Sequence, residues 1–414
     1  MRNRLAAIGS IAGLALLSTA CVPNEPAPEQ SQATDGGAAA IAVSSTDDAC
    51  EVSTAEATSG TLTFEVTNDG SQVTEFYLMA QDGLRIIGEV ENIAPGAART
   101  LTTTVQPGDY LTLCKPGMLG AGVGSAVFSV SGEQITISGE DAELKQEAVD
   151  LYAAFVKAQV GELLPAVQGF VALYQAGDDD AAREQFAQVR TFYERIEPVA
   201  EALGDLDPRI DYREVDARAE GLDWTGFHRI EKDLWAPEPG DVNSDGSDAL
   251  LDWQPSTQQQ RQEFGDLLVA DVTELYDFVH SSDFTDYLNE QGIDWISNGA
   301  IGLLDEVATG KITGEEDWWS GTDRGDFAAN VEGSQMAFSL VRDFAVSQGA
   351  DGEQLVADIE GGYSDLSDRL ADFGSLEAGF VNYSELTDAD KRDLSDLINA
   401  LAEPLSQLTS TILV

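Results

Sequence analysis

Basic residues are scarce in this 414-residue chain. It has 22 Lys and Arg against 74 Asp and Glu, which gives a formal net charge of −52 at pH 7. A surface this acidic has no basic patch to neutralise nucleic-acid phosphates or to dock on anionic lipid headgroups. A general nucleic-acid binder is therefore excluded, and we expect the surface to concentrate cations.

Histidine and cysteine are also few. The chain has two histidines, His228 and His280, and three cysteines. There is no P-loop ending in Gly-Lys-Ser/Thr and no dinucleotide fingerprint after a strand. The two cysteines after Cys21 lie in residues 47–140, which contain no histidine. This excludes both a catalytic Cys–His pair and a blue-copper centre of two His and one Cys in that region.

Long apolar runs are absent outside the N-terminus, where a membrane-spanning helix would need ~20 apolar residues. The apolar run 5–17 is too short for a span and follows two arginines, which is typical of a signal peptide over residues 1–20. The string LLSTAC resembles a bacterial lipobox, with Ser18 where Leu is usual, and predicts lipidation of Cys21. The alternative is ordinary secretion with Cys21 unmodified. We expect an exported protein, lipid-anchored to the outer face of the cell membrane and periplasmic in a Gram-negative cell.

The rest of the chain divides into a tether and two folded regions. Residues 21–46 are rich in Pro, Ala, Gln and Gly and predict a flexible tether. Residues 47–140 alternate apolar and polar residues in seven or so short segments, as in TLTFEVTN, and predict a β-sandwich. From 141 to 414 the period becomes helical and predicts an all-α bundle. The predicted fold class is therefore multidomain β plus α.

One pair in the helical region carries metal-binding chemistry. His228 and Glu231 stand three residues apart in GFHRIEKDLW, so on a helix the imidazole and the carboxylate share a face. Such a pair is a natural start for a metal site. The alternative is a histidine at a helix start beside a surface glutamate. In a chain this acidic, spacing alone does not select the further ligands.

Several segments of the chain together resemble a known family. YERIEPVAEALGDLDPRID, GFHRIEKDLW, IGLLDEVATGKITGEED and DFAANVEGSQ are similar to the signature segments of the imelysin-like domain in EfeO-type iron-uptake proteins. Cys50-Glu51, ENIAPG and QPGDYLTLC resemble the cupredoxin-like domain of the same proteins. The resemblance implies a cupredoxin-like β-sandwich followed by an imelysin-like helical bundle. It also implies an extracytoplasmic protein that passes iron to a membrane permease, alongside a secreted haem peroxidase.

The resemblance also implies a set of metal ligands. The family's HxxE motif falls on His228 and Glu231, and the expected further ligands are Glu194, Glu197, Glu306 and Glu316. The chain reads WWSGTD where the family often has a histidine, so Gly321 replaces that residue. One imidazole with several carboxylates suits iron as Fe(II) or Fe(III), and zinc also accepts such ligands. Two alternatives to iron uptake remain: a metallopeptidase, which the missing HExxH layout disfavours, and a non-catalytic acidic surface lipoprotein.

The cysteines of the β region allow two interpretations. Cys50 and Cys114 form a disulfide in an oxidising compartment, or Cys114 binds copper. In the second case the other ligands are drawn from Cys50, Met118, Glu75 and Glu89, because a thiolate four residues from a thioether suits Cu(I).

A short acidic segment, DVNSDGSDALLD (241–252), resembles an EF-hand calcium loop. The candidate ligands are Asp241, Asn243, Asp245, Ser247 and Asp252, with Gly246 at the turn. The alternative is a polar surface loop between two helices.

Overall fold

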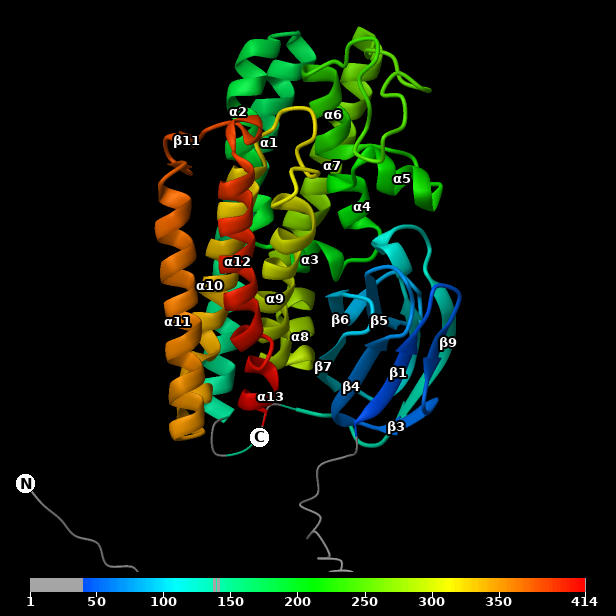
Figure 1. Cartoon of the computed structure of the whole chain (residues 1–414), viewed down its shortest axis with the longest axis vertical. Helices are drawn as coiled ribbons and strands as arrows, with labels where there is room; N and C mark the ends of the chain where they lie inside the picture. The colour runs from blue at the N-terminus through cyan, green and yellow to red at the C-terminus, as the bar shows by residue number, and fades with distance from the viewer. Residues whose placement is uncertain (1–39, 137–138, 140–141, 414) are drawn as a thin grey trace, which may run out of the picture. The chain divides into compact units, whose positions relative to one another are not determined.

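The computed structural model describes residues 40–136, 139 and 142–413. The predicted signal peptide 1–20, the lipidation site Cys21 and the tether up to residue 39 lie outside the described residues. The described residues belong to a single compact unit in which a β region is followed by a helical region (Figure 1).

Two sheets make up the β region, and they form the sandwich that the period-two pattern predicts. One sheet has the order β2-β1-β4-β7, from Cys50–Val52, Ile41–Ser45, Gly60–Asn68 and Ala98–Val105. The other has the order β3-β9-β8-β5-β6, from Glu56–Thr58, Val123–Ser131, Gly108–Cys114, Thr74–Ala80 and Ile86–Ile93. Leu62, Phe64 and Val66 alternate along β4 and are buried between the sheets. This arrangement fits a cupredoxin-like domain.

The predicted tether 21–46 extends too far, because residues 41–45 form strand β1. Ile41 and Val43 alternate into the sandwich core, and β1 pairs in parallel with β4, with Ile41 opposite Phe64. The apolar alternation in this segment is short and follows a run of alanines, so composition alone does not reveal the strand. Burial against β4 gives the segment a fixed place in the sheet.

Thirteen α-helices are described after the sandwich. The long ones are α1 (Ala142–Ala176), α2 (Asp179–Glu194), α7 (Gln258–Val279), α9 (Ile293–Glu306), α10 (Asp323–Ser347), α11 (Ala350–Ala371) and α12 (Asp388–Leu405). The short ones are α3 (Glu197–Glu201), α4 (Leu206–Asp211), α5 (Glu214–Glu220), α6 (Gly226–Leu234), α8 (Ser282–Gln291) and α13 (Leu408–Ile412). A π-helical turn, η2, follows α9 over Val307–Lys311. No helix in the described part of the chain is both long and apolar enough to cross a membrane.

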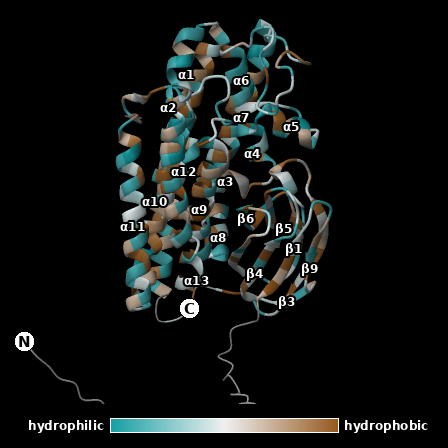
Figure 2. Cartoon of the chain, in the orientation of Figure 1, coloured by the Kyte–Doolittle hydropathy of each residue, from teal (hydrophilic) through white to brown (hydrophobic). Residues whose placement is uncertain are grey.

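The long helices pack side by side around one apolar core. Helix α1 packs against α2 and α7, and α10 packs against α9, α11 and α2. Figure 2 shows hydrophobic and hydrophilic residues alternating along these helices, as expected for elements that bury one face. At Gly333 of α10 an added Cβ would lie 2.5 Å from the carbonyl oxygen of Arg195, so α10 and the end of α2 come close there. This close approach places the middle of α10 beside the C-terminal end of α2, where the side-chain amide of Asn330 donates to the carbonyl of Glu194 at 2.8 Å.

Candidate metal centre

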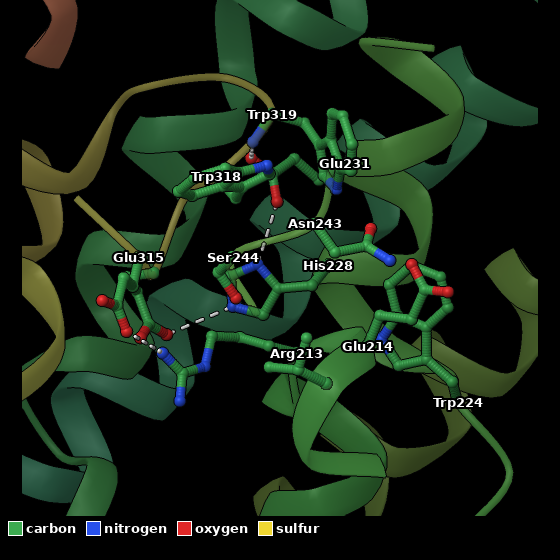
Figure 3. Close-up of a pocket in the computed structure, with 12 residues that line it drawn as sticks. Arg213, Glu214, Trp224, His228, Glu231, Asn243, Ser244, Glu315, Trp318 and Trp319 are labelled. Carbon is green, nitrogen blue, oxygen red and sulfur yellow. Dashed lines mark hydrogen bonds and ion pairs between the residues drawn. The ribbon is translucent and has the colours of Figure 1, made fainter. Parts of the chain in front are cut away.

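A pocket in the helical region contains three of the six residues that were predicted to bind iron. It is lined by His228 and Glu231 of α6, by Glu316 of the segment after η2, and by aromatic and polar side chains around them (Figure 3). Trp224, Trp318 and Trp319 are among these aromatic residues. The pocket therefore combines charged groups with apolar walls, which limit water around the charges.

Helix α6 is held against α4 at a glycine. Gly226 has φ +81°, and a Cβ at this position would lie 2.1 Å from the carbonyl oxygen of Ile210. Only glycine accepts both the conformation and the contact. The contact sets His228 of α6 opposite Asp211, the last residue of α4.

The imidazole of His228 is buried, with 2% of the residue exposed, and carboxylates face both ring nitrogens. Nδ1 lies 3.0 Å from Oε2 of Glu231 and 3.8 Å from Oδ1 of Asp317. Nε2 lies 3.2 Å from Oε1 of Glu316 and 3.5 Å from Oδ1 of Asp211. Each pair of carboxylates forms, with its ring nitrogen, a group of three atoms close enough together to surround one ion.

These carboxylates control the protonation of the ring. Burial lowers the pKa of His228, and so does the charge of Arg190. Hydrogen bonds to Glu231 and Glu316, with the charge of Asp211, outweigh both effects and raise the pKa to about 10. In the absence of a bound ion, the ring is therefore an imidazolium at neutral pH, with an N–H directed at each side.

Glu231 is fixed by the backbone as well as by the ring. Its Oε1 accepts hydrogen bonds from the backbone N–H of Trp319, at 3.1 Å, and of Ser320, at 2.8 Å. Its Oε2 faces Nδ1 of His228. Both oxygens of this carboxylate are therefore engaged.

A fully buried guanidinium balances much of the remaining negative charge. Arg190 of α2 forms ion pairs with five carboxylates: Glu194 at 2.5 Å, Asp326 at 3.0 Å, Glu316 at 3.4 Å, Asp317 at 3.5 Å, and Asp211. Burial of these acids would be costly without a cation among them. Arg190 is thus the structural centre of the acidic cluster.

A second buried cation holds the other predicted ligands. Lys311 Nζ lies 3.0 Å from Glu194, 3.1 Å from Glu197 and 3.8 Å from Glu306. Burial raises the pKa of Glu316, but the charges of Lys311 and His228 outweigh it and hold that pKa well below its usual range. Of the predicted ligands, Glu231 and Glu316 thus contact the imidazole. Glu194, Glu197 and Glu306 gather instead around Lys311, and Glu194 also contacts Arg190.

Five residues of the cluster escaped the sequence analysis as site residues: Asp211, Asp317, Asp326, Arg190 and Lys311. Asp211 and Asp317 lie in DLDPRID and GEED, segments that carried the resemblance, but no periodicity relates either of them to His228. Arg190 lies four residues before Glu194 on α2, a spacing that places both on one helix face. That spacing was the one available signal for it.

Of the two interpretations of the cysteines in the β region, copper binding by Cys114 and Cys50 is wrong and the disulfide is confirmed. Cys50 and Cys114 form a disulfide, with a Cα–Cα distance of 5.4 Å, which links β2 of one sheet to β8 of the other. Neither sulfur is then a thiolate ligand. Glu75 is buried and accepts a hydrogen bond from the hydroxyl of Tyr77 at 2.8 Å. Among the described residues, the groups of His, Cys, Asp and Glu that could surround an ion include neither Glu75 nor Glu89, and Met118 gains no thiolate partner.

The calcium prediction also finds no support, because candidate ligands of the loop form hydrogen bonds with other protein groups. Asn243 is buried, and its Oδ1 accepts a hydrogen bond from Nζ of Lys232 at 3.0 Å. Asp241 and Asp245 accept hydrogen bonds from backbone N–H groups of their own loop, at Glu238 and Ser247. In the described part of the chain the carboxylates of Asp241, Asp245 and Asp252 do not converge. The oxygen of Asn243 that would bind calcium thus accepts a hydrogen bond from an ammonium group instead.

The loop instead covers the pocket around His228. Asn243 and Ser244 line this pocket, and the indole N–H of Trp318 donates to the carbonyl of Val242 at 2.8 Å. The ammonium of Lys232 lies 4.8 Å from the ring centre of Trp319. The segment is therefore part of the wall of the pocket around His228.

Comparisons with known proteins agree with this architecture. The sequence profile of the imelysin family matches residues 148–408. The "Iron uptake system component EfeO" of Escherichia coli O1:K1 is 35% identical over 376 residues, which cover 90% of this chain and 91% of that protein. The proteins of the same name from E. coli K12 and Shigella flexneri are 34% identical over the same length and coverage.

A solved structure is similar to part of the chain. It is a putative iron-regulated protein A precursor from Parabacteroides distasonis, with a TM-score of 0.46 and 15% identity. The match covers 68% of this chain and 97% of that one. From the family profile and the extent of identity to the EfeO proteins, the chain belongs to the imelysin family and is an EfeO-type protein.

Proposed function

We propose that this protein is an extracytoplasmic iron-binding component of an iron-uptake system, and that it captures iron at the cluster around His228 and passes it to a membrane permease. The observation that carries the proposal is the buried imidazole with carboxylates at both ring nitrogens, at 3.0–3.8 Å. The relatives whose alignment covers 90% of the chain, at 34–35% identity, are named as iron uptake components.

The donor set suits iron. One imidazole among several carboxylates is a hard, oxygen-rich set that favours Fe(II) and Fe(III) over Cu(I). Zinc also accepts these ligands, so the experiments below include it. We propose His228, Glu231 and Glu316 at the core of the site, and Glu194, Glu197 and Glu306 as an outer ring around Lys311. The net charge of −52 raises the local cation concentration around the pocket.

The proposed location and partners follow from the same family. The Cys50–Cys114 disulfide supports folding in an oxidising compartment. Lipidation of Cys21 would hold the protein at the outer face of the membrane, where a permease and a secreted haem peroxidase of the same system would meet it. We propose a carrier role without catalysis, although the family also bears the designation peptidase M75.

The test is an anaerobic titration of the metal-free protein with ferrous ion, repeated with ferric citrate and zinc. The wild type should bind iron, and His228→Gln should lose at least tenfold in affinity. The matched control is His280→Gln, because His280 is the other histidine of the chain and stacks on Tyr276 at the end of α7, away from the cluster. Equal iron affinity in wild type and His228→Gln would refute the proposal. Cleavage of casein that stops on chelation would support the peptidase alternative.

A further inference from the structure

The two sides of the imidazole differ in the freedom of their carboxylates. On the Nδ1 side, Glu231 is bound through Oε1 to two backbone N–H groups and through Oε2 to the ring. An ionised carboxylate can only accept hydrogen bonds, so the ring must present an N–H at Nδ1. The contact between Glu231 and the ring joins residues three apart on one helix. A movement of α6 as a whole therefore does not break it.

On the Nε2 side, the carboxylates come from different elements, and within the described part of the chain their ion pairs are with the side chains of Arg190 and His228. Asp211 ends α4, and Glu316 follows η2. Both pair with the guanidinium of Arg190, which has Glu194, Asp317 and Asp326 as further partners. Arg190 therefore keeps ion pairs if Asp211 and Glu316 turn toward an ion.

The spacing on the Nε2 side also fits a single ion. Metal–ligand bonds of ~2.0–2.2 Å place neighbouring ligand atoms about 3–3.6 Å apart. The distances from Nε2 to Glu316 and Asp211 are 3.2 Å and 3.5 Å. On the Nδ1 side the distance to Glu231 is 3.0 Å, within this range, but the distance to Asp317 is 3.8 Å, outside it.

We infer that iron binds at Nε2 of His228 together with Asp211 and Glu316, and that Glu231 is a positioning residue that keeps the proton on Nδ1. The inference rests on the proposed function and deepens it, because it reassigns the second residue of the HxxE pair and adds Asp211 as a ligand. When the ion binds, the Nε2 proton leaves to solvent and the Nδ1 proton stays. A carboxylate behind a ligating imidazole orients the ring and raises its donor strength.

The experiment uses the small number of histidines. In protein labelled with 15N at histidine, the imidazole spectrum contains His228 and His280 alone. Zinc serves as the diamagnetic probe, added to the full-length protein. The inference predicts a zinc-bound Nε2 and a retained N–H at Nδ1 of His228, with His280 unchanged. Zinc at Nδ1, or at both ring nitrogens, would overturn it. No change at His228 with zinc, and no iron binding in the titration above, would instead overturn the proposed function.

Three variants of site residues and one control complete the test. Glu231→Gln has the shape of the carboxylate but can present an amide N–H to Nδ1, so the ring proton should move to Nε2 and iron affinity should fall about 10–100-fold. Glu231→Asp should regain part of the affinity and the Nδ1 proton. Asp211→Asn should weaken iron binding while Nδ1 keeps its N–H, and the exposed Asp368→Asn should change neither. A Glu231→Gln protein with wild-type iron affinity, or with its ring proton still on Nδ1, would overturn the inference.

Discussion

Oδ1 of Asp211, the last residue of α4, lies 3.5 Å from Nε2 of His228, in the first turn of α6. The contact depends on Gly226, whose missing side chain lets α6 start directly against the carbonyl of Ile210. The geometry of the proposed metal site is therefore set by the packing of two short helices.

We predict that Gly226→Ala destabilises the protein and removes iron binding together. The new Cβ would meet the Ile210 carbonyl at 2.1 Å, and φ +81° is strained for alanine by about 1–3 kcal/mol before the clash is counted. Urea unfolding measures the first effect and iron titration the second. The control is Gly361→Ala on α11, where an added Cβ meets nothing within 4 Å and should not destabilise the helix. A Gly226→Ala protein with wild-type stability would show that α6 does not need this close contact.

Removal of Arg190 should strongly destabilise the metal-free protein. Arg190→Gln leaves Asp211, Asp326 and Glu194 buried without their main cation, and breaking a buried pair typically costs about 3–5 kcal/mol. Added iron should raise the melting temperature of this variant more than that of the wild type, since the ion supplies positive charge to the same acids. The control is Arg342→Gln, whose ion pair with Glu360 is exposed and should matter little. Equal melting temperatures in both variants would contradict this account of the cluster.

Reduction of the Cys50–Cys114 disulfide should weaken the β region. The bond closes a loop of 64 residues, which corresponds to about 4 kcal/mol of chain entropy in the unfolded state. Cys50→Ser with Cys114→Ser should therefore unfold at lower urea concentration. Dithiothreitol should lower the stability of the wild type but not of the double variant. If the reductant had no effect on either protein, the disulfide would have no stabilising role.

The pH dependence of stability should contain a contribution from His228. Its pKa in the folded, metal-free protein is raised to about 10 from a value near 6.5 in the unfolded chain. The stabilisation is fully present below pH 6.5 and is lost as the pH rises from 6.5 towards 10. Unfolding free energies of wild type and His228→Gln should therefore converge over this range. Because iron must replace a ring proton, iron affinity of the wild type should rise over the same range. A difference between the two proteins that stays constant with pH would contradict the raised pKa.

Local patterns predicted much of this protein correctly. The alternation of Leu62, Phe64 and Val66 placed a strand in a sandwich, and the change of period after residue 140 placed the helical region. The i, i+3 spacing of His228 and Glu231 put an imidazole beside a carboxylate, as found at 3.0 Å. These features depend on residues close together in the chain, whose relative directions follow from backbone geometry alone.

Other features depended on contacts between distant segments. The sequence left Cys50 and Cys114 open between a disulfide and a metal site, and the meeting of β2 with β8 decided for the disulfide. The 241–252 segment has the spacing of a calcium loop, yet burial of Asn243 against Lys232 turns its oxygen inward.

The sequence by itself determined the acidity, the order of β and α regions, and the HxxE pair on one helix face. The tertiary structure alone decided that Asp211, Glu316 and Asp317 surround His228, that Arg190 and Lys311 neutralise the remaining acids, and that residues 41–45 complete a sheet. The reason is physical: helix and strand periodicity fixes directions within an element, whereas the meeting of acids from separate elements depends on how those elements pack.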